Sequence, residues 1–237
     1  DKSRGERAAS VLLPLPCRTN TDDRYFGDEW QALPRRGYTR IFENMIMADP
    51  NITVRLNVDF FAQRDKLPKA GLTIFTGPID AYYASQGLPQ LEYRSLRFFE
   101  EYHEPATEGG FYQECLQLNY PGPEVDFTRI VEYKHKPNQP KAARESKGTV
   151  IFKEYSCDHG EPYYPVPNPA NHELYVKYQA MASKEPGVCF VGRLASYKYF
   201  NMDQAFLNAL EMFDEVKGSG RVPGQERTEL GEGDGPK

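Results

Sequence analysis

Side chains able to take part in chemistry gather between Arg193 and Gln204, near the end of the chain. The preceding Gly192, a cation and two tyrosines join a short apolar segment, expected to be a buried strand, to a helix expected to begin near Asn201. Asn201 and Gln204 have the spacing of a reciprocal helix cap. The N–H groups left at such a helix start attract a phosphate or an anionic ring. Every helix needs a cap, however, so the spacing alone also fits a purely structural role.

Arg129 is a second candidate, because it falls on a mainly apolar face of a predicted strand. Alternation along residues 126–133 places Phe127, Val131 and Tyr133 on the same side as this arginine. A guanidinium in that position needs an acceptor. A carboxylate on a neighbouring strand could supply one, and so could a diphosphate held through two hydrogen bonds. The sequence leaves both open, and the ion pair is the simpler.

Tyr163 and Tyr164 stand between Pro162 and Pro165, which stiffen the loop and restrict the directions of both rings. Rigid phenols suit the recognition of sugars and phosphates, although they serve equally well as part of a core.

Composition excludes several classes of partner. The 29 basic and 34 acidic residues give a formal net charge of -5, so no strong positive field attracts nucleic acid or an anionic membrane. The four cysteines are far apart, which favours free thiols in a reducing cytosol, and the four histidines lack metal-ligand spacing, so no metal is expected. No signal peptide or membrane-spanning stretch is evident. We expect a cytoplasmic protein that does not insert into membranes.

Local periodicity predicts the elements that must position these residues, and the fold class they indicate is α+β. One helix is expected over residues 37–48, with strands over 52–58 and 72–75. Segments rich in aromatic and branched residues predict an antiparallel sheet, with a solvated loop over 136–147; they cover residues 91–99, 112–120, 127–135 and 149–155.

Two helices and a short strand are predicted in the last third of the chain. A helix over 169–184 is expected to be capped by Asn171, followed by a strand over 188–191. The final helix, over 201–216, is expected to bury Phe206, Leu210 and Phe213 and to end at Lys217–Gly218. The Gly- and Glu-rich remainder is expected to be disordered.

From about Ala9 to Val216 the chain resembles the bacterial type of UDP-galactopyranose mutase. Short segments carry the resemblance in the family's order: residues 23–26 (DRYF), 33–39 (LPRRGYT), 76–80 (TGPID), 92–96 (EYRSL), 118–120 (LNY), 127–130 (FTRI), 161–165 (EPYYP) and 192–203 (GRLASYKYFNMD).

The resemblance implies a flavin-dependent isomerase that interconverts UDP-galactopyranose and UDP-galactofuranose on reduced FAD. Flavin N5 would attack the anomeric carbon, UDP would leave, and the sugar would reclose with the other ring size. It also implies an antiparallel substrate domain, with the terminal strand and helix belonging to a discontinuous FAD-binding domain.

The resemblance assigns roles residue by residue. Arg18 and Arg129 would grip the diphosphate and offset the charge of the departing UDP. The residues implied on the substrate side are Trp30, Asn119, Tyr163, Tyr164, Tyr199 and Asn201. Those implied at the flavin are Thr76, Gly77, Arg193, Met202 and Asp203.

The chain departs from the family pattern in several places. Asn201 stands where the family usually has aspartate, Ala195 replaces a glycine, and Trp30 replaces tyrosine or phenylalanine. No G-x-G-x-x-G turn occurs, so the family's N-terminal flavin-binding βαβ segment would lie upstream and this chain alone is expected to bind FAD weakly or not at all.

Residues 1–17 would then be a remnant of an upstream helical region or linker, residues 18–218 the family's C-terminal region, and residues 219–237 a tail. A noncatalytic sugar-nucleotide-binding remnant and an amine-oxidase-like flavin enzyme remain alternatives. A homodimer also remains open.

Overall fold

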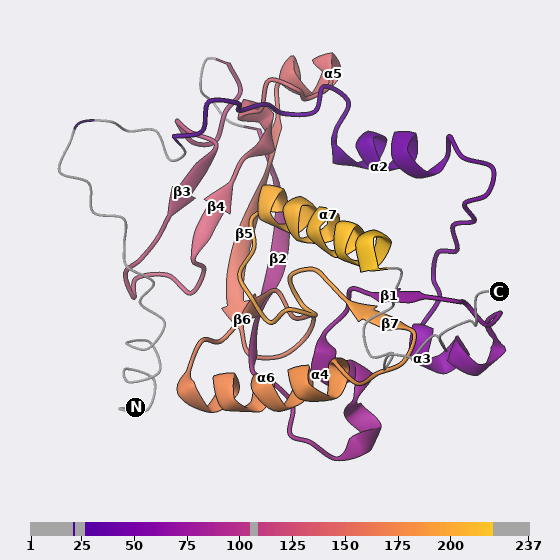
Figure 1. The fold of residues 1–237 in the computed structure, drawn as a ribbon. Helices are drawn as coiled ribbons and strands as arrows, with labels where there is room; N and C mark the ends of the chain where they lie inside the picture. The colour runs from indigo at the N-terminus through magenta and orange to yellow at the C-terminus, as the bar shows by residue number, and fades with distance from the viewer. Residues whose placement is uncertain (1–20, 22–26, 105–108, 220–237) are drawn as a thin grey trace, which may run out of the picture. The chain divides into compact units, whose positions relative to one another are not determined.

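A computed structural model describes residues 21, 27–104 and 109–219 (Figure 1). Two compact units divide these residues, and each is described by itself. The first unit contains the described residues of 61–95 and 161–237, and the second contains those of 13–60 and 96–160. No helix in the described ranges is long and apolar enough to cross a membrane.

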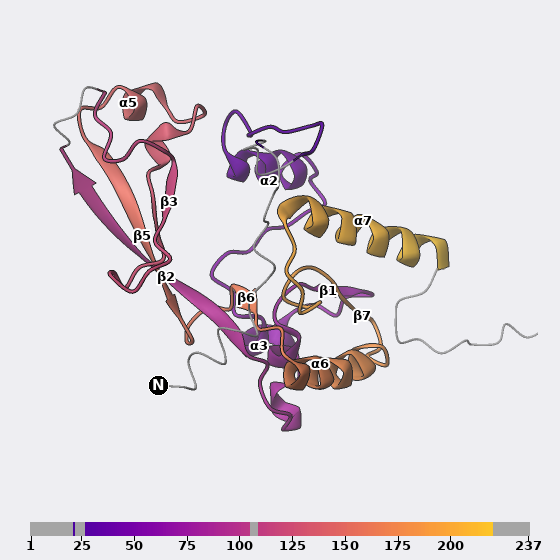
Figure 2. The same cartoon turned by 90° about the vertical axis from the view of Figure 1, so that its left-hand side faces the viewer.

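A parallel pair of strands, β1 (Thr73–Phe75) and β7 (Val188–Phe190), lies at the centre of the first unit, with Ile74 opposite Cys189. The pair lies between helix α6 (Pro169–Ala182) and helix α7 (Met202–Ser219) (Figure 2). The shorter elements of this region are α3 (Phe60–Gln63), η1 (Arg64–Lys66), α4 (Ile79–Tyr82) and η2 (Ala84–Gln86). Both strands were predicted from their apolar runs.

Aromatic rings form the core on the α6 side of this sheet. Phe75 packs against Tyr82 with ring centroids 5.1 Å apart, and Tyr83 stacks on Tyr178 of α6. Tyr83 and Tyr178 are almost completely buried. Burial of side chains this large dominates the energy of a small core, which explains why the polar composition of the chain still permits a folded unit.

Helix α6 begins at Pro169 as predicted, but its cap is a different residue from the one expected. Asn168, not Asn171, caps the helix: its side chain accepts a hydrogen bond of 2.7 Å from the N–H of Asn171. Pro169 follows the cap, where its missing N–H costs nothing. Asn171 is buried, and its side-chain amide donates to the carbonyl of Val166. It therefore connects the first turn of α6 to the segment before the helix.

Helix α7 turns a different face inward from the one predicted. The partly buried residues are Ala205, Asn208, Met212 and Val216. Phe206, Leu210 and Phe213, which the periodicity assigned to the core, are 46%, 61% and 59% exposed. The prediction of their burial is therefore wrong. The expected end at Lys217–Gly218 is also wrong, because the helix continues to Ser219.

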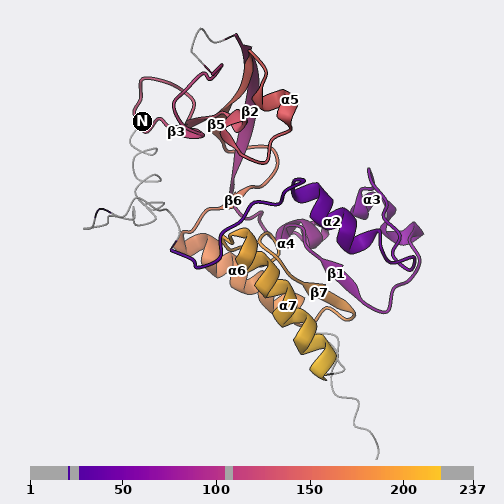
Figure 3. The same ribbon diagram turned by 90° about the horizontal axis from the view of Figure 1, so that it is seen from above.

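The second unit is built on an antiparallel sheet, as predicted. The five-stranded sheet has the order β3-β4-β5-β2-β6, although β6 (Tyr164–Pro165) and the first residues of β2 (Tyr93–His103) belong to the first unit. The other strands are β3 (Gln117–Asn119), β4 (Arg129–Val131) and β5 (Thr149–Cys157). Figure 3 shows the short helix α5 (Lys141–Arg144) near the start of β5. That helix occupies part of the segment expected to be a loop.

Two predictions in the second unit have opposite outcomes. Helix α2 (Tyr38–Ile46) forms as expected. The strand expected over 52–58 is wrong: the segment is irregular and Ile52, Val54 and Leu56 are exposed. Asn57 has a φ of 56°, which interrupts extended backbone. Alternation alone does not make a strand when no neighbouring strand among the described residues pairs with it.

A buried ionic network connects β4 to the loops beside it. Glu132 is completely buried and accepts hydrogen bonds from the backbone N–H groups of Tyr112 and Gln113 and from the hydroxyl of Thr149. Lys134, in the turn η3 (Tyr133–His135), donates to the carbonyls of Gly110, Ser146 and Gly148. Burial opposes ionisation of Glu132, but its hydrogen bonds prevail and lower the pKa of the carboxyl group.

Candidate functional site

In the first unit, the structure brings together three residues that the resemblance assigns to the site. The guanidinium of Arg193 lies 4.8 Å from the ring centroid of Tyr164 and 4.5 Å from that of Tyr199. The two rings are stacked, with 10° between their planes. A planar cation attracts the faces of both rings. Arg193 is therefore held as part of a rigid group that also presents two phenols.

Arg193 retains unused hydrogen-bonding capacity in this group. One terminal nitrogen donates to the carbonyl of Phe200 at 3.2 Å. Its Nε is buried and has no acceptor among the described residues. A buried donor without a partner is costly, so this nitrogen favours a ligand that brings an acceptor oxygen or nitrogen.

Tyr197 fixes the turn that carries Tyr199. Its φ of 46° lies in the left-handed region, which a side chain of this size rarely adopts. Its hydroxyl donates to the carbonyl of Glu92 at 2.6 Å, and its ring packs edge-on against Tyr93. Burial raises the pKa of the Tyr197 phenol to about 12, so it remains a donor at neutral pH. These contacts hold the turn in a conformation that it would otherwise avoid.

Three of the predicted flavin residues, Thr76, Gly77 and Arg193, lie just beyond the carboxyl ends of β1 and β7. Because these strands are parallel neighbours, Thr76 and Gly77 follow β1 beside the segment that leads from β7 to Arg193. The N–H of Val191 donates to the carbonyl of Phe75, which continues the pairing to this edge. Carboxyl ends of parallel strands are the usual edge for ligands in sheets with helices on both faces.

Close packing explains the glycine at position 77. A Cβ atom placed there would lie 2.8 Å from the Phe75 ring, which the core holds in place. Gly192, at the end of β7, has a φ of 94°, and its N–H donates to the side chain of Asn208 on α7 at 2.8 Å. Sequence reasoning missed Asn208, because a polar residue between helical apolar positions carries no signal of its partner.

The start of α7 shows half of the predicted reciprocal cap. The N–H of Asn201 donates to Oε1 of Gln204 at 2.8 Å. No hydrogen bond to the Asn201 side chain is present among the described residues. Met202 and Asp203 follow in the first turn and are exposed, so the helix start is open to solvent in this unit.

In the second unit, Arg129 and Asn119 are cross-strand neighbours on β4 and β3. Nε of Arg129 lies 3.3 Å from Oε2 of Glu154, its register partner on β5. This is the structural ion pair that the sequence left open as the alternative to a bound diphosphate. The contact lacks hydrogen-bond geometry, and Nε has no other acceptor in the described part of the chain. Burial raises the pKa of Glu154, and the charge of Arg129 opposes that rise.

The remaining substrate-side candidates are less constrained. Trp30 is 86% exposed. The backbone N–H of Tyr163 donates to the carbonyl of Arg94, which aligns its loop with β2. Arg18 lies outside the described residues, so its predicted role remains a prediction. No cluster of side chains able to hold a metal ion occurs within the ranges that the structure describes.

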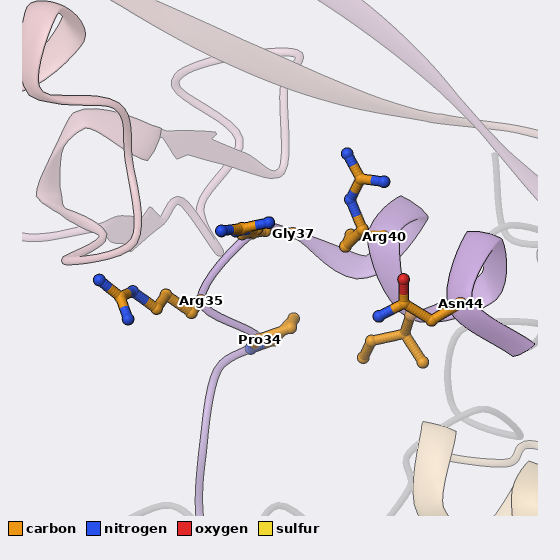
Figure 4. Close-up of a pocket in the computed structure, with 7 residues that line it drawn as sticks. Pro34, Arg35, Gly37, Arg40 and Asn44 are labelled. Carbon is orange, nitrogen blue, oxygen red and sulfur yellow. The ribbon is translucent and has the colours of Figure 1, made fainter.

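A basic pocket of about 500 Å³ at the start of α2 was not predicted. Its lining includes Arg35, Arg36, Arg40 and Asn44. Arg40 and Asn44 lie one turn apart on the helix, and Arg35 lies on the segment before it (Figure 4). Arg40 also pairs with Glu43 at 2.8 Å. The spacing of the three arginines was the only available signal, and such runs are usually solvated.

Comparisons with known proteins agree with the family resemblance. The family model described as UDP-galactopyranose mutase matches residues 2–199. A probable UDP-galactopyranose mutase from Klebsiella pneumoniae is 38% identical, with 90% of this chain and 53% of that protein covered. A dTDP-fucopyranose mutase from Escherichia coli is 36% identical over 87% of this chain and 54% of its own length.

A UDP-galactopyranose mutase from Mycoplasma pneumoniae is 31% identical, over 87% of this chain and 53% of its own length. The chain thus spans about half the length of the curated relatives it matches. The matched segment includes Asn119, Arg129, Tyr164, Arg193 and Tyr199, the residues whose geometry is described above. By this match over most of its residues, the chain belongs to the UDP-galactopyranose mutase family.

Proposed function

We propose that this chain supplies the diphosphate- and galactose-binding side of a mutase that interconverts UDP-galactopyranose and UDP-galactofuranose. The group formed by Tyr164, Arg193 and Tyr199 is the observation that supports this most strongly. It combines a fixed cation with two phenols, which suits a ligand that carries both anionic and hydroxyl groups.

Arg129 would bind the diphosphate. Its guanidinium is anchored on one side by the Glu154 ion pair, and the side chain is still 37% exposed. An arginine positioned in this way loses little conformational entropy when it binds an anion, and two parallel hydrogen bonds to phosphate oxygens match its shape. Asn119, its neighbour across the strand pair, would add a neutral donor. Arg18 would contribute a second cation.

The residues present also fit half of a flavin site. The buried unpaired Nε of Arg193 calls for an acceptor, and Thr76 and Gly77 lie at the same sheet edge. With Met202 and Asp203, these residues would hold FAD. A bound reduced flavin would supply the nucleophile for the sugar. The part of the chain is then to orient the sugar and to stabilise the negative charge that develops on UDP as it leaves.

Two sugar nucleotides are candidates for the substrate. Most of the relatives reported above carry names based on UDP-galactopyranose, but the second is named for dTDP-fucopyranose at nearly the same identity. Both names describe mutases of a nucleoside-diphosphate pyranose. We propose UDP-galactose as the substrate, with dTDP-fucose as the alternative.

A turnover assay tests this function. The chain, supplied with FAD and dithionite, is given UDP-galactofuranose or the furanose form of dTDP-fucose, and the products are separated by chromatography. Formation of UDP-galactopyranose, lost in Arg129→Ala and kept in the exposed control Arg144→Ala, supports the proposal. Because the chain alone is expected to bind FAD weakly, the flavin that it retains is measured by its absorbance. UDP binding without turnover by the flavin-loaded chain would favour the noncatalytic sugar-nucleotide-binding alternative. Conversion of the dTDP sugar alone would overturn the choice of substrate.

A further inference from the structure

The basic pocket at the start of α2 carries positive charge that the proposed function does not use. Its lining includes Arg35, Arg36 and Arg40 and no acidic residue. Arg40 pairs with Glu43, which lies outside the lining. Arg35 and Arg36 form no ion pair with any residue that the structure describes. Because the whole chain has a formal net charge of -5, its composition does not account for this local excess of cations.

The turn that carries these arginines is held in place by a second segment of the same unit. The carbonyl of Pro34 accepts hydrogen bonds from the N–H of Gly37 and from the side-chain amide of Asn138, each at 3.1 Å. Gly37 has φ 80° and ψ 166°, a conformation that is essentially limited to glycine. Figure 4 shows Gly37 at the bend between Arg35 and Arg40. The backbone is therefore set before a ligand binds, which lowers the entropy that binding costs.

The charge of the pocket indicates the chemical class of its ligand. Three guanidinium groups around one pocket repel one another, and a bound anion removes that repulsion. A phosphate monoester carries a charge of about -1.5 to -2 at neutral pH and offers three acceptor oxygens. A guanidinium can donate two parallel hydrogen bonds to such oxygens. The side-chain amide of Asn44, one turn after Arg40 on α2, can add a neutral donor.

The pocket is larger than a phosphate group alone. Its volume is about 500 Å³, within the range of pockets that hold small organic ligands. Pro34 and Ile41 contribute apolar surface to the lining. We propose that the pocket binds a small phosphate monoester, with its phosphate on the three arginines and its organic group against Pro34 and Ile41.

This site is distinct from the proposed sugar-nucleotide site. Neither Arg129 nor Asn119 lines the pocket. Arg129 is the first residue of β4, and the chain passes through the rest of β4 and through η3 before it reaches Asn138 beside the pocket. The inference does not rest on the mutase reaction, so it can fail or succeed separately from the proposed function.

A phosphorus NMR titration of phenyl phosphate with the full chain tests the inference. Near neutral pH and at low salt we expect saturable binding, which weakens as salt is added. The double variant Arg35→Gln, Arg36→Gln should weaken binding at least about tenfold, and so should Arg40→Gln. Glu43→Gln should tighten it, because the substitution removes the carboxylate that competes for Arg40. The three arginines are exposed, so these variants should keep the melting temperature of the unmodified chain.

Arg97→Gln is the matched control. It removes the same charge from an exposed arginine of the same unit, outside the pocket lining, and its affinity for phenyl phosphate should equal that of the unmodified chain. Arg129→Ala should also leave this affinity unchanged. Inorganic phosphate should bind more weakly than phenyl phosphate, because it lacks the group that contacts Pro34 and Ile41.

Four results would overturn the inference. The chain could show no saturable binding of phenyl phosphate. An equal loss of affinity in Arg97→Gln would reduce the binding to a general attraction of anions. Loss of binding in Arg129→Ala would assign the ligand to the sugar-nucleotide site. Equal affinities for inorganic phosphate and phenyl phosphate would contradict the contact with an organic group.

Discussion

The rings of Tyr164 and Tyr199 are nearly parallel, with centroids 5.9 Å apart and 10° between their planes. They come from segments 35 positions apart in the sequence, and Arg193 contacts the face of each. The geometry links strand β6 to the turn before α7 through a cation. The residues of the proposed site therefore come from two segments that no local sequence pattern connects.

Removing the Arg193 guanidinium should loosen this pair of tyrosines. Arg193→Leu loses two cation–π contacts at about 0.5–1 kcal/mol each, so we expect the free energy of unfolding to fall by about 1–2 kcal/mol. Arg193→Lys keeps the charge without the planar shape, so its free energy of unfolding should lie between those of Arg193→Leu and the unmodified chain. Urea denaturation followed by tyrosine fluorescence measures the effect. Equal stability of Arg193→Leu and the unmodified chain would contradict the assignment.

Gly77 is predicted to tolerate no side chain. Gly77→Ala places a methyl group against the Phe75 ring, which the aromatic core holds, so the variant should lose about 1–3 kcal/mol of stability. Gly71→Ala is the matched control, because a Cβ there meets nothing within 4 Å. Thermal unfolding of the two variants compares them directly. A Gly77→Ala protein as stable as Gly71→Ala would show that the ring can move.

The Glu132 network should make stability depend on pH. The pKa of the Glu132 carboxyl group is lowered in the folded state. The stabilisation that the ionised carboxylate provides is therefore fully present above the unfolded pKa of about 4.3, and it is lost as pH falls through the folded pKa. Glu132→Gln should cost about 1.5–3 kcal/mol at neutral pH, and the difference should shrink in that acidic range. Denaturation series from pH 7 to pH 3 measure this. A constant difference across the series is the contrary result.

Arg129 should control the ionisation of Glu154. Burial raises the pKa of this carboxyl group and the arginine opposes the rise. In Arg129→Gln the pKa of Glu154 should therefore rise further, and in Arg144→Gln it should not change. Carbon-detected NMR titration of the carboxyl groups resolves the shift. A lower pKa of Glu154 in Arg129→Gln would show that another group dominates its environment.

The antiparallel sheet and most helices could be predicted because their signals are local. Alternation and turn residues identified β2 and β5, and apolar spacing identified α2 and α6. The wrong predictions share one physical cause: the structure of these segments depends on which other segment they pair with or pack against. Residues 52–58 alternate without a strand to pair with, and α7 has two apolar stripes of which the weaker one faces the sheet.

The candidate site was predicted only in part for a similar reason. The place of Arg193 after a predicted strand favoured anion binding, whereas the sequence left Arg129 open between an ion pair and a diphosphate. The family resemblance added Tyr164 and Tyr199, but their stacking on Arg193 depends on tertiary packing. Asn208 and the left-handed turn at Tyr197 carried no local signal, although both hold the segment around Arg193 in place.

A calorimetric titration of the chain with UDP tests the central claim most directly. The account predicts binding that weakens at least about tenfold in Arg129→Ala and that is unchanged in Arg144→Ala. Added inorganic phosphate at equal concentration should compete poorly, because it lacks the diphosphate and the nucleoside. The absence of UDP binding, or equal affinity in Arg129→Ala and Arg144→Ala, would contradict the proposed sugar-nucleotide site.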